Sequence, residues 1–224
     1  MEVDDGDEVA VESTDMTTTS RHHFGDSSDT SDAFFITIIE SMKEEYGLFV
    51  WPCSVVLAEY VWQQKSRFLG ATVVELGAGT SLPGLVAAKL GSDVTLTDDS
   101  ERLEVLANMK RVSRLNNLKC KVMGLTWGVW DAPSFDLHPK IILGADVFYE
   151  ARGIYFLSLK NGKPCCLCFQ KCSGHHLIEF LMMKWGLKCV KLLDGFSFMP
   201  FCKASSLSGN IQLAEIVYNG EQVS

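Results

Sequence analysis

The stretch "VVELGAGTSLPGLVAAKLGSDVTLTDD", Val73–Asp99, holds the strongest evidence about the fold. It opens with a β-branched apolar run that predicts a buried strand over 71–76. An Ala/Leu-rich segment, 81–90, then predicts a helix that ends at Gly91, and 93–98 predicts a second strand that ends on carboxylates. Strands that alternate with helices in this way indicate a parallel sheet with right-handed crossovers. We therefore expect an α/β protein.

The rest of the chain continues this alternation. Apolar runs predict further strands, and longer apolar or amphipathic segments predict helices. The expected strands are 119–125, 140–146, 165–169, 189–193 and 211–218, and the expected helices are 54–65, 100–117 and 173–186. Pro52 marks the start of the first of these helices, and Ser100 is the expected N-cap of the second. The apolar run "FFITIIES" (34–41) is of ambiguous type.

Composition divides the chain into two parts. Of the 224 residues, 47% are hydrophobic, which is enough for one domain with a sizeable core. Residues 1–32 hold ten acidic side chains against Arg21 alone and almost no large apolar groups, so we expect an acidic, disordered tail. The folded domain is then 33–224, with eighteen acids and nineteen bases. A nearly neutral domain without a basic stripe argues against direct nucleic-acid binding.

Several other classes of protein do not fit this chain. No apolar run reaches the roughly 18 residues of a membrane span, and the acidic first residues differ from those of a signal peptide. We therefore expect no membrane association. The eight cysteines of such a chain are expected to be reduced thiols, as in the cytosol or nucleus.

A cluster of cysteines and histidines resembles a zinc site at first sight. It consists of Cys165, Cys166, Cys168, Cys172, His175 and His176. A strand would point Cys165 and Cys166 to opposite faces, and no paired C-x-x-C knuckle is present. Since cysteine is also a common small core residue, we expect no metal.

The turn between the first predicted strand and helix is where a ligand would bind in such a sheet. Gly77 and Gly79 allow a tight turn and a close approach of the backbone, because neither has a Cβ. A dinucleotide-binding turn would place its third glycine at position 82, where this chain has Leu; the next is Gly84, after Pro83. Proline in the first helical turn removes an amide that a pyrophosphate would need. A nicotinamide oxidoreductase is therefore disfavoured.

Two carboxylates frame this turn. Glu75 precedes it at the end of the first strand, where it would repel a pyrophosphate but could attract an ammonium group. Asp98 ends the second strand, placed to accept hydrogen bonds from both hydroxyls of a ribose. An acid, a glycine turn and a second acid together suit S-adenosylmethionine, which has an amine, a sulfonium and a ribose but no phosphate. The sequence predicts this cofactor.

Four stretches resemble the S-adenosylmethionine-dependent methyltransferases of family 16. They are "GLFVWPCSVVLAEYV" (47–61), the quoted stretch 73–99, "LTWG" (125–128) and "IILGADVFYE" (141–150). Their order and spacing also fit, and the resemblance covers 34–150 well and the remainder more loosely. It implies a seven-strand Rossmann-like sheet with helices on both faces and an antiparallel last strand. The methyltransferase domain would be 33–224.

The resemblance assigns roles to individual residues. The cofactor-binding residues would be Trp51, Glu75, Gly77, Gly79, Asp98, Trp127 and Asp146, with Gly128 beside Trp127 in the segment that packs on the adenine. Asp146 and Tyr149 match an Asp-x-x-Tyr element that faces the acceptor. Asp146, Tyr149 and Glu150 are the expected catalytic residues: Asp146 holds the acceptor, Tyr149 shapes its slot and Glu150 assists.

Within the family, the chain is most similar to a member associated with arginine methylation of histone H3. The resemblance thus implies a protein-arginine N-methyltransferase of histone H3, monomeric, in nucleus and cytoplasm, with chaperones or transcription factors as further partners. Two alternatives stay open. The acceptor is a lysine, or the protein is a cofactor-binding scaffold with weak or lost catalysis, because the segment 151–164 is shorter than the helix that usually follows this motif.

Overall fold

The computed structural model describes residues 17–25, 32–41, 46–129, 132–147, 165–170, 180, 182–184 and 186–218. At positions 46, 133, 134, 165–170 and 218 it describes the backbone alone. Tyr149 and Glu150, two of the expected catalytic residues, lie outside the described residues, as do most of 1–32 and all of 151–164.

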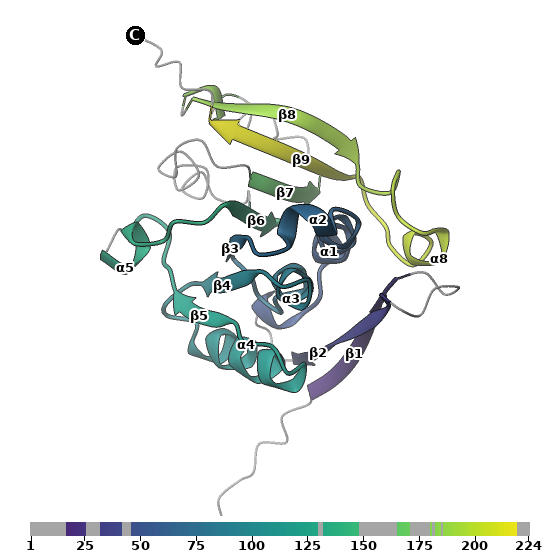
Figure 1. Cartoon of the computed structure of the whole chain (residues 1–224), viewed down its shortest axis with the longest axis horizontal. Coiled ribbons are helices and arrows are strands. Elements are labelled where there is room, and N and C mark those ends of the chain that lie inside the picture. The colour runs from purple at the N-terminus through teal and green to yellow at the C-terminus, as the bar shows by residue number, and fades with distance from the viewer. Residues whose placement is uncertain are drawn as a thin grey trace, which may run out of the picture.

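The described chain forms a seven-stranded sheet with helices packed against it, and a separate two-stranded sheet (Figure 1). The strands are β1 (Thr17–Phe24), β2 (Phe34–Ser41), β3 (Thr72–Leu76), β4 (Asp93–Asp98), β5 (Lys121–Gly124), β6 (Ile141–Ala145), β7 (Cys165–Gln170), β8 (Leu187–Asp194) and β9 (Ile211–Tyr218). The helices are η1 (Tyr46–Leu48), α1 (Pro52–Gln63), α2 (Lys65–Phe68), α3 (Leu82–Lys89), α4 (Leu103–Leu115), α5 (Ala132–Phe135) and α8 (Phe201–Ala204).

The order of the large sheet is β5-β4-β3-β6-β7-β9-β8. Strands β3 to β7 pair in parallel, and β9 lies antiparallel between β7 and β8. The expected seven-strand sheet with an antiparallel last strand is confirmed. The chain steps outward from β3 to β5 and then returns to the other side of β3 with β6. The strand order therefore reverses between β3 and β6, and a ligand is expected there.

The central strands are buried on both faces, so their side chains divide between two apolar clusters. Val73 of β3 belongs to the cluster covered by α1, α3 and α4, whereas Val74 belongs to the cluster on the opposite face. Ile141 and Ile142 of β6 divide in the same way. Met182, in a helical stretch before β8, packs on the second face. Successive side chains of a strand point to opposite faces of the sheet, so both faces are apolar and both are covered, as expected for helices on each side.

The ends of the helices follow the predicted signals in part. Pro52 is the first residue of α1, and Gly91 has a φ of 94° just after α3, as expected for a glycine that ends a helix. The prediction that Ser100 caps α4 was wrong. The helix starts at Leu103 with Arg102 at the N-cap position, because 99–102 are taken up by the turn that follows β4.

The prediction that 1–32 is disordered was wrong for Thr17–Phe24, which forms β1 and pairs antiparallel with β2 along its whole length. Phe24 is almost fully buried, and its ring lies 5.6 Å from that of Phe34. The folded region thus starts before residue 33. The acidic composition averaged over 1–32 concealed a Thr-rich segment that gains its stability from its partner strand. The ambiguous run 34–41 is β2.

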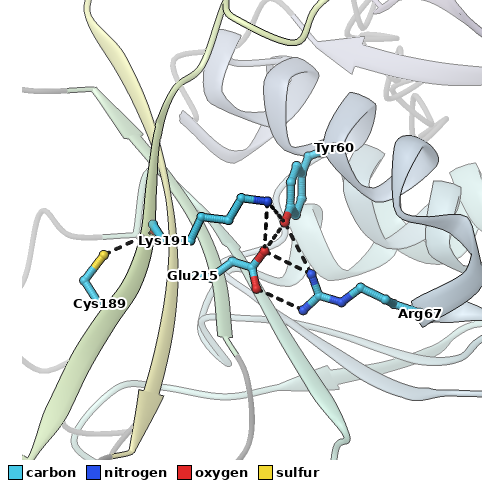
Figure 2. A network of polar contacts seen from close by, with 5 residues as sticks. All are labelled: Tyr60, Arg67, Cys189, Lys191 and Glu215. Atoms are coloured by element: carbon cyan, nitrogen blue, oxygen red, sulfur yellow. Dashed lines mark hydrogen bonds and ion pairs between the residues drawn. The ribbon is translucent and has the colours of Figure 1, made fainter.

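A polar network attaches the terminal strands to the helices (Figure 2). Arg67 of α2 donates two hydrogen bonds to Glu215 of β9, at 3.0 and 3.1 Å. The buried Tyr60 of α1 also donates its hydroxyl to Glu215, and the Lys191 ammonium of β8 lies 3.6 Å from the same carboxylate. Burial raises the pKa of Glu215, but the bonds from Arg67 and Tyr60 outweigh it and leave that pKa lowered. The β8–β9 pair is therefore attached to α1 and α2 by charge-assisted hydrogen bonds.

None of the helices in the described part of the chain is both long and apolar enough to cross a bilayer.

Candidate cofactor site

A cavity of about 640 Å³ opens at the carboxyl ends of the parallel strands. Its walls come from the segments that follow β3, β4, β5 and β6, together with the segment that leads into α1. The lining residues are Gly47, Phe49, Trp51, Ser54, Gly77, Ala78, Gly79, Thr80, Asp98, Asp99, Arg102, Leu125, Thr126, Trp127, Ala145, Asp146 and Val147. The cavity therefore lies at the point where the strand order reverses, as the topology requires.

The glycine turn forms the floor of this cavity. Gly77 and Gly79 have φ values of 53° and 51°, which favour glycine. A Cβ on Gly77 would lie 3.3 Å from Val147 and 3.6 Å from the ring of Trp127. A Cβ on Gly79 would lie 3.2 Å from the carbonyl oxygen of Gly47. Side chains at the two glycines would thus be strained and crowded, and their absence leaves the backbone open to a ligand.

Asp98 forms the adjacent wall. Its Oδ2 accepts the N–H of Gly79 at 2.9 Å, and its Oδ1 accepts the N–H of Asp99 at 2.9 Å. Burial raises the pKa of Asp98, while these two backbone bonds oppose the rise. The turn therefore fixes the orientation of the carboxylate. Each oxygen has a further lone pair, so the carboxylate has the capacity that the predicted contact with two ribose hydroxyls requires.

Glu75 does not line the cavity, which corrects the prediction that it contacts the cofactor. Its side chain is only 1% exposed and lies under the first turn of α3, where Oε2 accepts the N–H of Gly84 at 2.9 Å. Burial raises the pKa of Glu75 to about 8. The sequence placed Glu75 beside the turn but did not say on which side of the strand its side chain lies. Glu75 holds the helix against the sheet instead.

The third glycine of this segment is Gly84 and not residue 82, and its surroundings show why a glycine is needed there. A Cβ at this position would lie 2.4 Å from the Glu75 carboxylate and 2.5 Å from Leu96 of β4. Only glycine lets α3 approach the sheet closely enough for its amide to reach the buried carboxyl group. The glycine therefore serves helix–sheet packing rather than phosphate binding.

The two expected tryptophans both line the cavity. Trp51 occupies the N-cap position of α1 and is 42% exposed, whereas Trp127 is half-buried over Gly77. Gly128 has a φ of 90° but is exposed and does not line the cavity. The structure thus brings one of the aromatic rings to the mouth and the other to the floor.

Asp146 lies at the edge of the cavity, just after β6. Its φ of 58° is unusual for a residue with a side chain, although aspartate tolerates this conformation better than most. Such strain at the end of a central strand is typical of functional positions.

Several lining residues were not among the predicted ones. Arg102 and Asp99 follow β4, and Asp99 is tied to the segment after β5 by the hydroxyl of Thr126, at 2.7 Å. The Thr126 bond is also the main reason why the pKa of Asp99 is lowered. Gly47 and Phe49 come from the segment before α1. Their signal in the sequence was only their inclusion in stretches that matched the family.

The cavity fits S-adenosylmethionine by its chemistry. Its described walls carry the carboxylates of Asp98, Asp99 and Asp146 against one cation, Arg102. An excess of negative charge suits a sulfonium and an ammonium group and disfavours a diphosphate. Because Gly77 and Gly79 have no Cβ, such a ligand can lie close to the backbone of the turn.

The structure does not describe the side chains of the cysteine–histidine cluster (Cys165–His176), so the prediction that this cluster holds no metal stays a prediction. Among the side chains that the structure describes, no group of three or more His, Cys, Asp or Glu could hold a metal ion.

Residues 30–181 match the model of methyltransferase family 16, whose description is "Lysine methyltransferase". The match covers more than half of the chain. The chain belongs to this family. It is a methyltransferase with S-adenosylmethionine as its cofactor, and the cavity between β3 and β6 is where its residues would hold that cofactor.

Relatives of this family member carry more specific names. A protein of Xenopus laevis named histone-arginine methyltransferase METTL23 is 38% identical over 76% of this chain and 78% of its own length. The human protein of the same name is 41% identical over 66% of this chain and 84% of its own length. A zebrafish (Danio rerio) protein named protein N-lysine methyltransferase METTL21A is 42% identical over 45% of this chain and 47% of its own length.

Solved structures support the fold of the family member. The 16S rRNA N2 G1207 methyltransferase of T. Thermophilus aligns with a TM-score of 0.59 and 14% identity, over 90% of this chain and half (50%) of its own. Magnesium protoporphyrin IX methyltransferase of Synechocystis aligns with a TM-score of 0.53 and 15% identity, over 74% of this chain and 77% of its own. At these identities the likeness concerns the fold alone.

Proposed function

We propose that this protein transfers a methyl group from S-adenosylmethionine to an arginine side chain of a histone, with histone H3 as the first candidate. The observation that carries the proposal is the similarity to proteins named histone-arginine methyltransferase, which extends over most of this chain and most of theirs. The similarity to the lysine-specific relative is confined to less than half of each chain.

The charge of the cavity supports a cationic acceptor. Asp98, Asp99 and Asp146 outnumber Arg102 in its described walls. A guanidinium group is planar, cationic and rich in donors, so it needs carboxylates that orient it and disperse its charge. Asp146 is suited to this because its backbone at the end of β6 aims a short acidic side chain at the cavity edge.

The bound cofactor supplies an activated methyl carbon on its sulfonium. In an in-line transfer the S–C bond breaks, an N–C bond forms, and the acceptor nitrogen loses a proton. The task of the protein is therefore to align the acceptor nitrogen and to exclude water. We assign the alignment to Asp146, with Tyr149 shaping the slot and Glu150 assisting; the last two assignments rest on the sequence motif alone.

Mass spectrometry tests this proposal. The full-length protein is incubated with recombinant histones and methyl-deuterated cofactor, and the labelled residue is located by fragmentation. We expect label on an arginine of histone H3. At saturating cofactor, the Asp146→Asn variant should lose transfer by about a hundredfold or more in kcat, a loss that weaker cofactor binding alone would not produce. Asparagine is a matched replacement because it tolerates the same positive φ. Unchanged transfer by this variant would refute the role of Asp146.

Lysine is the second candidate acceptor. It is favoured by the description of the family model and by the lysine-specific relative. A lysine must lose its proton before attack, so transfer would rise steeply with pH toward the lysine pKa. An arginine acceptor, which stays protonated in water, would show a shallower dependence. Label found only on lysine in the histone experiment would decide for this alternative. Absence of label on any protein, with intact cofactor binding, would favour the scaffold.

A histone substrate requires access to the nucleus. We propose that the protein occurs in nucleus and cytoplasm as a monomer, with chaperones or transcription factors as further partners. Fluorescence microscopy of a tagged full-length chain, and light scattering of the purified protein, test the first two points directly.

A further inference from the structure

A glutamate of the two-stranded sheet reaches the wall of the cofactor cavity. Glu40 of β2 accepts two hydrogen bonds, one on each carboxylate oxygen. Its Oε1 accepts the hydroxyl of Ser20 on β1 at 2.7 Å, and its Oε2 accepts the backbone N–H of Val50 at 3.0 Å. Val50 directly precedes Trp51, which lines the cavity. The contact therefore connects the β1–β2 hairpin to the cofactor site across ten positions of chain.

The segment that Glu40 holds forms one side of the cavity. Gly47, Phe49 and Trp51 all line it. The segment contains a single turn of 3-10 helix and then an irregular stretch, so it has no strand pairing of its own to fix it. Gly47 is packed between the glycine turn and α4, since a Cβ on it would lie 2.8 Å from Val105. At the other end, the bond from Val50 to Glu40 fixes the backbone one residue before the N-cap of α1.

The hairpin is a rigid support, because side chains of α4 and its C-terminus bind the backbone of β2. Asn116 accepts the N–H of Thr37 at 2.8 Å and donates to the carbonyl of the same residue at 2.7 Å, as a neighbouring strand would. Asn108 donates to the carbonyl of Ile39 at 3.0 Å. These bonds leave Glu40 at the end of a strand that cannot shift without breaking them.

We propose that Glu40 is a positioning residue for cofactor binding. It holds the Gly47–Trp51 segment, and with it the partly exposed Trp51 ring, in the place where the cavity can close on the cofactor. The hairpin is thus a functional part of the methyltransferase domain and not an appendage. The proposal concerns the cofactor site, so it is independent of whether the acceptor is arginine or lysine.

Calorimetric titration of the full-length protein with S-adenosylhomocysteine measures the effect. Glu40→Ala removes the acceptor of the Val50 N–H, and we expect the Kd and the cofactor KM to rise about tenfold, with kcat within about threefold of the wild type. Glu40→Gln keeps a carbonyl oxygen for that N–H and should stay within about threefold in Kd. This rescue by the amide distinguishes a positional role from a role of the charge.

Asn116→Ala is the matched control. It removes the bonds to Thr37 but leaves the bond from Asn108 to Ile39, next to Glu40, in place. It should therefore lower the Tm while the cofactor Kd stays within about twofold. Ser20→Ala, which frees one oxygen of Glu40, is a milder second variant for the case that Glu40→Ala does not fold; we expect about a threefold rise in Kd. An unchanged Kd in both Glu40→Ala and Ser20→Ala would overturn the proposal. So would a rise in Asn116→Ala as large as that in Glu40→Ala, because the effect would then be general destabilisation.

Discussion

Replacement of Glu75 by glutamine tests the electrostatics beneath the glycine turn. The carboxyl group is buried, accepts the Gly84 N–H, and has a pKa raised from 4.5 to about 8 by burial, with a contribution from Asp98. It is therefore mostly protonated and neutral at pH 7. Glutamine has nearly the same shape, keeps an oxygen for the Gly84 N–H, and does not titrate.

The sign of the effect follows from proton linkage. Between the unfolded pKa of 4.5 and the folded pKa of about 8, the folded state binds the proton and the unfolded state releases it. The stabilisation from this group is thus complete below pH 4.5 and is lost as the pH rises through 8. At about 1.4 kcal/mol per pKa unit, the loss is on the order of 3 to 5 kcal/mol. The Glu75→Gln variant lacks this loss.

Urea denaturation of both proteins at intervals between pH 5 and pH 9 measures the effect. The variant should be similar to the wild type at pH 5 and more stable by about 3 kcal/mol or more at pH 9. Other titrating groups, such as His22, whose pKa is lowered mainly by burial, contribute equally to the free energy of unfolding of both proteins. Their contributions cancel when the two proteins are compared at the same pH. A difference that does not change with pH would refute the raised pKa. Cofactor affinity should change less than about threefold, because Glu75 does not line the cavity; a large loss would mean that its charge contacts the cofactor.

Three further substitutions test the packing. Gly84→Ala should destabilise the protein by about 2 kcal/mol in urea denaturation, because its Cβ would lie 2.4 Å from the Glu75 carboxylate. Alanine normally stabilises a helix relative to glycine, so a stabilised variant would contradict the close packing. Arg67→Met should lower the free energy of unfolding by about 2 kcal/mol, since Glu215 loses two of its hydrogen bonds. We expect faster amide hydrogen exchange confined to β8 and β9. Unchanged exchange in these strands would contradict their attachment through Arg67. Lys203→Met should lower the free energy of unfolding by about 3 kcal/mol, because the buried Glu59 loses its ion pair at 2.6 Å. The double variant with Glu59→Leu should recover part of that stability in urea denaturation. No recovery would argue against the pair.

The parts of the fold that the sequence predicts well are local. Val73 to Asp98 contains its own strand, turn, helix and strand signals, and the structure follows them. The hairpin strand Thr17–Phe24 was missed because its stability comes from pairing with Phe34–Ser41 and from the burial of Phe24, neither of which is visible in a window of sequence. Non-local pairing overrides local composition in such cases.

The site could be predicted where the backbone conformation dictates the residue. Gly77 and Gly79 need positive φ, and Asp98 ends a strand beside them, so their roles could be inferred. Glu75 shows the limit of this inference. It lies next to the turn in sequence, yet its side chain points under α3. Arg102 reaches the cavity through a turn that carries no distinctive pattern in the sequence.

Calorimetry on the purified full-length protein tests the central claim, that the turn after β3 holds a cationic methyl donor and not a dinucleotide. We expect S-adenosylmethionine and S-adenosylhomocysteine to bind with measurable heat, and NAD to produce none at the same concentrations. Asp98→Ala should weaken binding of both adenosyl compounds by about tenfold or more. Heat from NAD without heat from either adenosyl compound, or undiminished affinity in Asp98→Ala, would contradict the account.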